Sequence, residues 1–534
     1  MSPKRYANFC ILILALVLAS ACGPAATATK QASDENAHPV APAATWVPLV
    51  QAPAQSSAGG LPAPTSVSFG MQPPNNQAYD YTFFQNYGVN PVIDTEDDAL
   101  STFALDVDTG AYTIMRSYVD NGSLPPTDSV RVEEYVNYFD QGYDYPPEGQ
   151  AFGIYVDGAP TPYGETERYQ MMRIGIQGYA VPAEARQDVS LTFVIDVSGS
   201  MDMDNRLGLV KQSLGLLVEQ LRPSDRVSIV VYGTEARVVL NPTPGDEQRK
   251  IMRAINDLHP EGVTNAEAGL RLGYQMADEA FNREGINRVI LCSDGVANFG
   301  ETGAETIWDE VKRYAGEDIT LTTVGFGMDN YNDVLMEQLA DKGNGFYAYV
   351  DDLWEAERLF VENLTSTLQI IARDARVQVE FNPEVVSRYR LVGFENRAIA
   401  DEDFRNDTVD AGEVGAGLSV TALYEIKLQE EAVGKIATVY LRWENPESNN
   451  TIELSQDFYT NQMAHAFDEA SPNVQWSVVV SEYAEILRDS YWAEGSTLSN
   501  VYEEAQRISR LLPEDGDVYE FVNLVRQASR MTNE

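Results

Sequence analysis

Regular alternation of apolar runs with helical segments between residues 188 and 365 constrains the fold of this chain more than any other feature. Strands are predicted at Ser190–Asp196, Arg226–Tyr232, Val289–Ser293 and Ile319–Gly325, with helices between and after them. Such alternation is typical of a parallel sheet covered by helices on both faces. The fold class predicted for this segment is therefore α/β, with a doubly wound, mainly parallel sheet of Rossmann-like type.

Three polar segments lie next to elements of this predicted sheet. The first apolar strand runs into an Asp-x-Ser-x-Ser sequence, a later strand ends in Asp-Gly, and a Gly-Val-Thr segment precedes a predicted helix. Open sheets of this kind bind ligands at the carboxyl ends of their strands. Hydroxyl and carboxylate oxygens are hard ligands that suit Mg²⁺ or Mn²⁺. The candidate metal-binding residues are Asp196, Ser198, Ser200, Thr264 and Asp294.

The chemistry expected of these residues is recognition rather than catalysis. The hydroxyls of Ser198 and Ser200 can bind Mg²⁺ directly, whereas Asp196 and Asp294 can hold metal-bound waters. With few carboxylates in contact with it, the ion keeps positive charge, and an acidic side chain of a partner can bind it. No nearby His or Lys is evident as a general base. The alternative interpretation is that these Ser and Thr residues only cap turns and helices.

The N-terminal segment predicts export and membrane attachment. Lys4 and Arg5 precede an apolar run too short to span a membrane, which ends in small residues before Cys22. This segment resembles a bacterial lipobox, whose cysteine is lipidated; an ordinary signal peptide or an uncleaved anchor is the alternative. We expect residues 1–22 to be a lipoprotein signal peptide, and residues 23–78, rich in Ala, Pro and Thr, to be a disordered tether. The expected location is periplasmic or at the outer cell surface.

The segments on either side of the predicted parallel sheet differ from it in pattern. Residues 79–187 indicate a mixed α/β region, residues 366–460 a β-rich region, and residues 461–534 a helical region. The strands after the parallel sheet could complete a β-sandwich begun before residue 188. The chain carries 37 Lys and Arg against 81 Asp and Glu, a net charge of −44, which opposes binding to nucleic acids.

Several longer segments carry a resemblance to a known family. They are Tyr87-Gly-Val-Asn-Pro-Val-Ile-Asp-Thr, Ser101-Thr-Phe-Ala-Leu-Asp-Val-Asp-Thr, Val130-Arg-Val-Glu-Glu-Tyr-Val-Asn-Tyr-Phe, Gly325-Phe-Gly-Met-Asp-Asn-Tyr-Asn-Asp and Asp410-Ala-Gly-Glu-Val-Gly-Ala-Gly-Leu-Ser-Val-Thr-Ala-Leu-Tyr-Glu. These segments resemble bacterial YfbK-type lipoproteins. The candidate metal ligands match the metal-ion-dependent adhesion site (MIDAS) of von Willebrand factor A (VWA) domains.

The resemblance implies a VWA domain at residues 188–365, flanked by two family-specific regions and without an established enzymatic activity. Two positions depart from what is usual. The loop reads Gly262-Val263-Thr264 where Gly-Gly-Thr or Gly-Ser-Thr is more common, and Asp329 stands where a glycine is expected. Neither departure removes an oxygen atom that could bind the metal.

The leading hypothesis is a cell-envelope lipoprotein with an adhesion or scaffold role and no catalysis. It would bind an acidic side chain of a protein partner through Mg²⁺ (or Mn²⁺ or Ca²⁺), and a membrane through the lipid on Cys22. The alternatives are a metal-assisted hydrolase or maturation factor, and a purely structural envelope protein. Asp108-Thr109-Gly110 resembles an aspartic-protease triplet but lacks a second one. The acidic run from Asp401 to Asp410 departs from EF-hand spacing.

Overall fold

The computed structural model describes residues 82–105, 108–163, 169–203, 206–295, 304–328, 331–512 and 515–532. The predicted signal peptide, the predicted tether, Cys22 and Asp329 lie outside these residues. The described residues belong to the unit Ser68–Glu534. Among the helices that the structure describes, none has both the length and the apolar character needed to cross a membrane.

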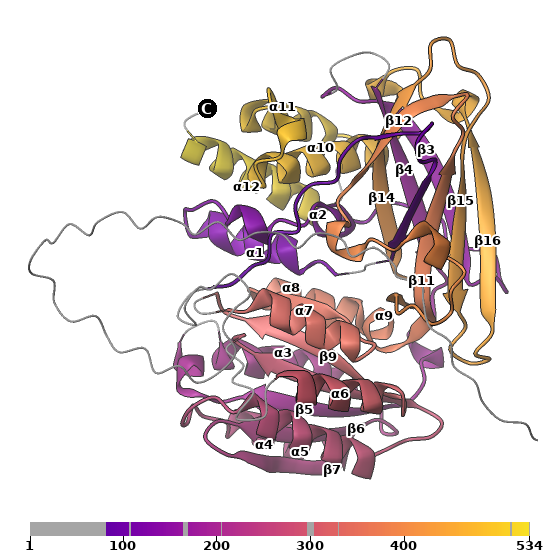
Figure 1. Cartoon of the computed structure of the whole chain (residues 1–534). Helices are drawn as coiled ribbons and strands as arrows, with labels where there is room; N and C mark the ends of the chain where they lie inside the picture. Colours follow the sequence, from indigo (N-terminus) through magenta and orange to yellow (C-terminus); the bar gives the residue numbers. More distant parts are fainter. Residues whose placement is uncertain are drawn as a thin grey trace, which may run out of the picture. The chain divides into compact units, whose positions relative to one another are not determined.

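A six-stranded sheet is the centre of the predicted VWA segment (Figure 1). In spatial order its strands are β10 (Tyr347–Val350), β9 (Ile319–Phe326), β8 (Ile286–Ser293), β5 (Val189–Asp196), β6 (Arg226–Tyr232) and β7 (Ala236–Pro244). All neighbours are parallel except β7, which runs antiparallel to β6. The four predicted strands are confirmed as β5, β6, β8 and β9, whereas the two edge strands β7 and β10 were not predicted.

Helices cover both faces of this sheet, as expected for a doubly wound fold (Figure 1). They are α3 (Leu207–Glu219), α4 (Gln248–Asn256), α5 (Ala266–Glu279), α6 (Ala304–Ala315), α7 (Asp333–Lys342), α8 (Leu353–Glu357) and α9 (Leu364–Leu368). Helix α5 packs closely on the sheet because it presents glycines there. A Cβ on Gly269 would lie 2.5 Å from the ring of Tyr232, and one on Gly273 would lie 2.3 Å from Val194. A larger residue at either position would force the helix away from the strands.

Two antiparallel sheets form a sandwich from strands before and after the VWA segment. One sheet contains β1 (Ile93–Asp94), β12 (Val386–Val392), β14 (Ser419–Leu428), β4 (Tyr169–Gly178) and β3 (Phe152–Pro160). The other contains β13 (Gly412–Gly415), β11 (Ile370–Phe381), β15 (Lys435–Glu444) and β16 (Thr451–Tyr459), with β2 (Leu100–Ala104) paired to β11. Phe103, Tyr424 and Trp443 lie in the core between the sheets. The expectation that strands on both sides of the VWA segment share a sandwich is confirmed.

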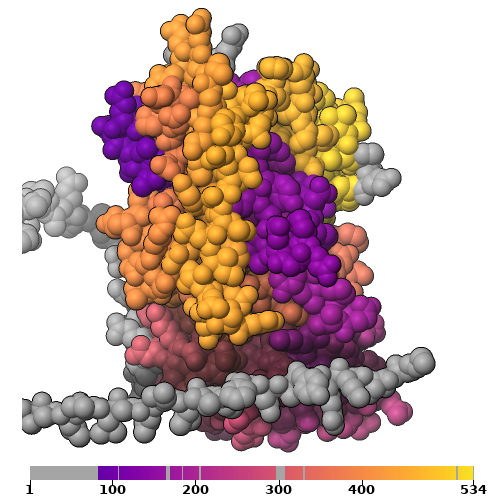
Figure 2. Space-filling model, turned by 90° about the vertical axis from the view of Figure 1, so that its right-hand side faces the viewer, coloured from indigo at the N-terminus to yellow at the C-terminus, as the bar shows by residue number. Residues whose placement is uncertain are grey.

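The edge strands of the two sheets lie next to each other at the molecular surface. In the space-filling view, the orange strand β16 is exposed beside the purple strand β3 (Figure 2), and the two strands are in contact. Most side chains of β16 are exposed.

Five helices from opposite ends of the chain share one further core. They are α1 (Gly110–Asp120), α2 (Val132–Asn137), α10 (Pro472–Leu487), α11 (Leu498–Ile508) and α12 (Gly516–Thr532). Leu423 of β14 belongs to the same core, so these helices cover the outer face of that sheet (Figure 1). Helix α10 buries Ser477 and Ser481 as well as Trp476. The helix lies between the sheet and other helices, and therefore has few exposed positions.

Candidate metal centre

The first part of the candidate site follows β5 directly. Asp196 is the last residue of this strand, and its Oδ1 accepts a hydrogen bond of 2.7 Å from the backbone N–H of Ser198. Ser293, at the end of the adjacent strand β8, donates from its hydroxyl to Asp196 Oδ2 at 3.2 Å. The hydroxyl oxygens of Ser198 and Ser200 lie 3.0 Å apart. Three of the predicted oxygen-bearing residues therefore meet at the carboxyl edge of the sheet.

The loop before α5 lies against this segment. The N–H of Gly199 donates to the carbonyl of Gly262 at 3.1 Å. Gly262 has φ +75°, and a Cβ there would lie 2.0 Å from the hydroxyl oxygen of Thr234, so only glycine fits. Asn265 accepts a hydrogen bond from the N–H of Ala268 and thereby caps α5. Thr264 lies between these two anchor points and is half-buried.

Asp294 follows β8 and is fully buried. Its Oδ2 accepts a hydrogen bond of 2.7 Å from the guanidinium of Arg206, which also donates to the carbonyl of Ser200 at 2.9 Å. Arg206 is buried, and it lies over Gly327, where a Cβ would come within 2.6 Å of its Nε. Sequence reasoning missed Arg206, because no spacing rule distinguishes this arginine from an exposed one at a helix start.

The electrostatics of the site favour a cation. Burial, followed by the nearby negative charge of Asp294, raises the pKa of the Asp196 carboxyl to about 7, although hydrogen bonds from Ser198 lower it. Arg206 forms an ion pair with Asp294. Two carboxylates buried close together repel each other, and a cation beside them lowers that repulsion. The hydroxyls of Ser198 and Ser200 add neutral oxygens, so the donor set suits a hard divalent ion.

The described residues contain no cluster of three or more His, Cys, Asp and Glu side chains arranged to hold a metal. This finding includes the acidic run from Asp401 to Asp410. There the side chain of Asp401 accepts a hydrogen bond of 2.6 Å from Thr102, and Asp407 pairs with Arg442 at 2.6 Å. The candidate metal centre at the edge of the VWA sheet differs from a cluster of this kind, because it combines two carboxylates with hydroxyl groups.

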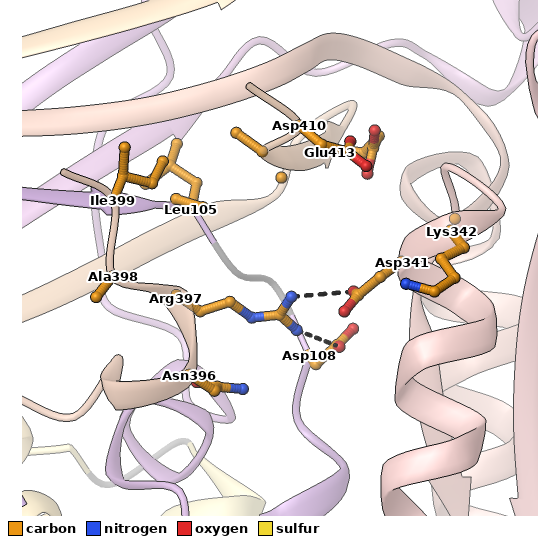
Figure 3. Close-up of a pocket in the computed structure, with 14 residues that line it drawn as sticks. Leu105, Asp108, Asp341, Lys342, Asn396, Arg397, Ala398, Ile399, Asp410 and Glu413 are labelled. Atoms are coloured by element: carbon orange, nitrogen blue, oxygen red, sulfur yellow. Dashed lines mark hydrogen bonds and ion pairs between the residues drawn. The ribbon is translucent and has the colours of Figure 1, made fainter. Parts of the chain in front are cut away.

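A separate pocket of about 260 Å³ lies between α7 and the sandwich (Figure 3). Arg397 extends into it and pairs with Asp341 at 3.0 Å and with Asp108 at 3.5 Å. Asp108 also accepts a hydrogen bond of 3.0 Å from the backbone N–H of Tyr347. The aspartate of the protease-like triplet therefore joins the N-terminal region to the VWA segment.

Models of known protein families match most of the described chain. The family model described as von Willebrand factor type A domain matches residues 190–366, and the one described as Uncharacterized protein YfbK, C-terminal, matches residues 366–531. A third, described as von Willebrand factor, matches residues 78–173.

Individual relatives agree with these matches. The Escherichia coli (strain K12) protein described as Uncharacterized protein YfbK is 34% identical over 476 residues, which cover 84% of this chain and 81% of the relative. An uncharacterized protein of Synechocystis sp. is 25% identical over 309 residues, 56% of this chain and 70% of that one. The solved structure of a von Willebrand factor type A protein from Catenulispora acidiphila has a TM-score of 0.42 at 15% identity, covering 70% of this chain and 89% of the other.

Proposed function

Because this chain belongs to the YfbK-type family of proteins with a VWA domain, we propose that it binds a protein partner through a divalent cation at the edge of its VWA sheet. VWA domains are modules of protein–protein interaction and of adhesion scaffolds. The observation that carries the proposal is the buried pair Asp196 and Asp294, with the hydroxyls of Ser198 and Ser200 beside it. The proposal assigns no catalytic step to this site.

Asp196, Ser198, Ser200, Thr264 and Asp294 would hold Mg²⁺, or Mn²⁺ or Ca²⁺ in its place. A bound ion would supply a Lewis-acidic position for a carboxylate of the partner. Ser293 and the backbone of Ser198 orient the Asp196 carboxylate, since both donate hydrogen bonds to it. The contact between Gly199 and Gly262 holds the Thr264 loop against the two serines.

The proposed location is the cell envelope. The lipobox-like segment before Cys22 supports lipid attachment there, and residues 23–78 would link that anchor to the domains. The net charge of −44 supports a protein rather than a nucleic acid as the partner.

Replacing Asp196 with asparagine should weaken Mg²⁺ binding on the order of 100-fold, because a buried carboxylate that faces the ion becomes neutral. The measurement is isothermal titration calorimetry of the full chain with Mg²⁺ and with Mn²⁺. Asp202→Asn is the matched control, since this exposed aspartate lies in the same loop but outside the donor set. Thermal melts in EDTA should show both variants folded. Equal Mg²⁺ affinity in Asp196→Asn and the wild type would refute the site.

Replacing Arg206 with glutamine should strengthen Mg²⁺ binding about tenfold, because a cation 2.7 Å from Asp294 opposes a second cation at the same carboxylate. Calorimetry at matched ionic strength measures this change. Arg313→Gln removes the same charge from the exposed end of α6 and should leave the affinity unchanged. A weaker affinity in Arg206→Gln would contradict this account and would show that the guanidinium positions Asp294 for the metal.

A further inference from the structure

A groove of about 940 Å³ opens beside the candidate metal centre. One wall is the short 3-10 helix Gly199–Asp202 with Met203 after it, so the groove begins on the segment that carries Ser200. The start of α8, at Leu353 and Trp354, also lines the groove. Pro260, which precedes the Thr264 loop, is a further lining residue. Because Met201 of the groove directly follows Ser200, a peptide bound at the candidate metal centre would reach the groove within a few residues.

The walls of the groove expose large apolar side chains. Met203 is 51% exposed, Leu353 is 45% exposed and Trp354 is 55% exposed. Val263, in the loop beside the metal site, is exposed as well. Exposed apolar side chains that cluster on a surface are typical of an interaction site. Tryptophan is often a hot-spot residue, which contributes much of the binding energy of an interface. The groove therefore suits a bulky apolar side chain of a partner.

The charge of the groove is negative. Asp202 and Asp352 are exposed carboxylates that line it. Asp351 is bonded to Arg116 at 2.6 Å, and the ammonium of Lys211 is bonded to backbone carbonyls, at 3.1 Å from that of Asn256. With a chain net charge of −44, a purely acidic peptide would meet repulsion everywhere except at the ion. A basic side chain near Asp202 or Asp352 offsets part of that repulsion.

We propose that the groove binds an extended segment of a partner protein that carries three side chains in a short stretch: an acidic one for the metal site, a bulky apolar one for the Met203–Trp354 walls, and a Lys or Arg for Asp202 and Asp352. The acidic contact rests on the proposed function, whereas the other two contacts depend only on the groove. The groove would therefore prefer a segment with acidic, basic and apolar side chains over a segment with acidic side chains alone.

The test is selection from a phage-displayed library of random dodecapeptides on the immobilised full chain, with binding in Mg²⁺ and elution by EDTA. The eluted sequences should share an acidic, a bulky apolar and a basic residue. Trp354→Ser should lower the affinity of a selected peptide about tenfold, since a tryptophan wall is lost. Asp202→Lys should replace the basic preference by an acidic one. Val433→Ser removes an exposed apolar side chain in the turn between β14 and β15, and should change nothing.

Three outcomes would overturn the inference. Sequences that share only an acidic residue, with Mg²⁺ binding intact by calorimetry, would reject the groove and leave the proposed function standing. Absence of Mg²⁺ binding by the folded chain would remove the proposed function and the acidic contact together. Mg²⁺-dependent dimerisation that is lost in Trp354→Ser would assign the groove to a second copy of this chain instead.

Discussion

Replacing Arg131 with methionine should lower the free energy of unfolding of the full chain by about 3–5 kcal/mol. Arg131, just before α2, is buried and donates to Asp333 of α7 at 2.7 Å. It also pairs with Glu134, and both carboxylates are fully buried. Without the guanidinium, the two buried carboxylates lose the positive charge that stabilises them. Removing one partner of a buried ion pair is strongly destabilising for this reason.

Urea denaturation followed by tryptophan fluorescence and by circular dichroism measures the loss in Arg131→Met. Arg313→Met is the control, because its partner Glu317 and Arg313 itself are half exposed, and such pairs contribute about 0–1 kcal/mol. A loss below 1 kcal/mol in Arg131→Met would mean that this network does not stabilise the contact between the N-terminal region and the VWA domain.

Replacing Phe521 with alanine should cost about 3–5 kcal/mol, as expected for a large aromatic side chain removed from a packed core. Phe521 of α12 is fully buried, and its ring centroid lies 5.1 Å from that of Trp476, 5.1 Å from that of Tyr483 and 5.5 Å from that of Phe139. The first two rings belong to α10, and Phe139 follows α2. The substitution therefore leaves a cavity between helices from both ends of the described chain.

Tyr519→Ala is the matched control for Phe521→Ala. Tyr519 lies two residues earlier on the same helix, but it is about half exposed, so its removal should change stability by about 0.5 kcal/mol or less. Thermal and urea denaturation of both variants measure the difference. Equal losses in the two variants would show that α12 does not belong to the shared core.

The VWA sheet and the composition of the candidate site were accessible from the sequence. The four central strands are rich in apolar residues and are buried along nearly their whole length, because a parallel sheet buries both of its faces. Asp196 and Asp294 could be placed at one edge because parallel strands end on the same side. The edge strands β7 and β10 were missed, since β7 is only partly buried and β10 is four residues long.

The sequence by itself determined the α/β class, the strand ends that carry Asp196 and Asp294, and the presence of β-rich and helical regions beside them. Local periodicity contains this information, because it records which face of an element is buried. Only the tertiary structure decided which distant charges meet. Arg131 and Asp333 lie 202 residues apart in the chain, and Arg206 and Asp294 lie 88 apart, yet each pair shares a buried hydrogen bond. The fold brings a carboxylate to each of these two buried arginines, and periodicity does not encode that partner.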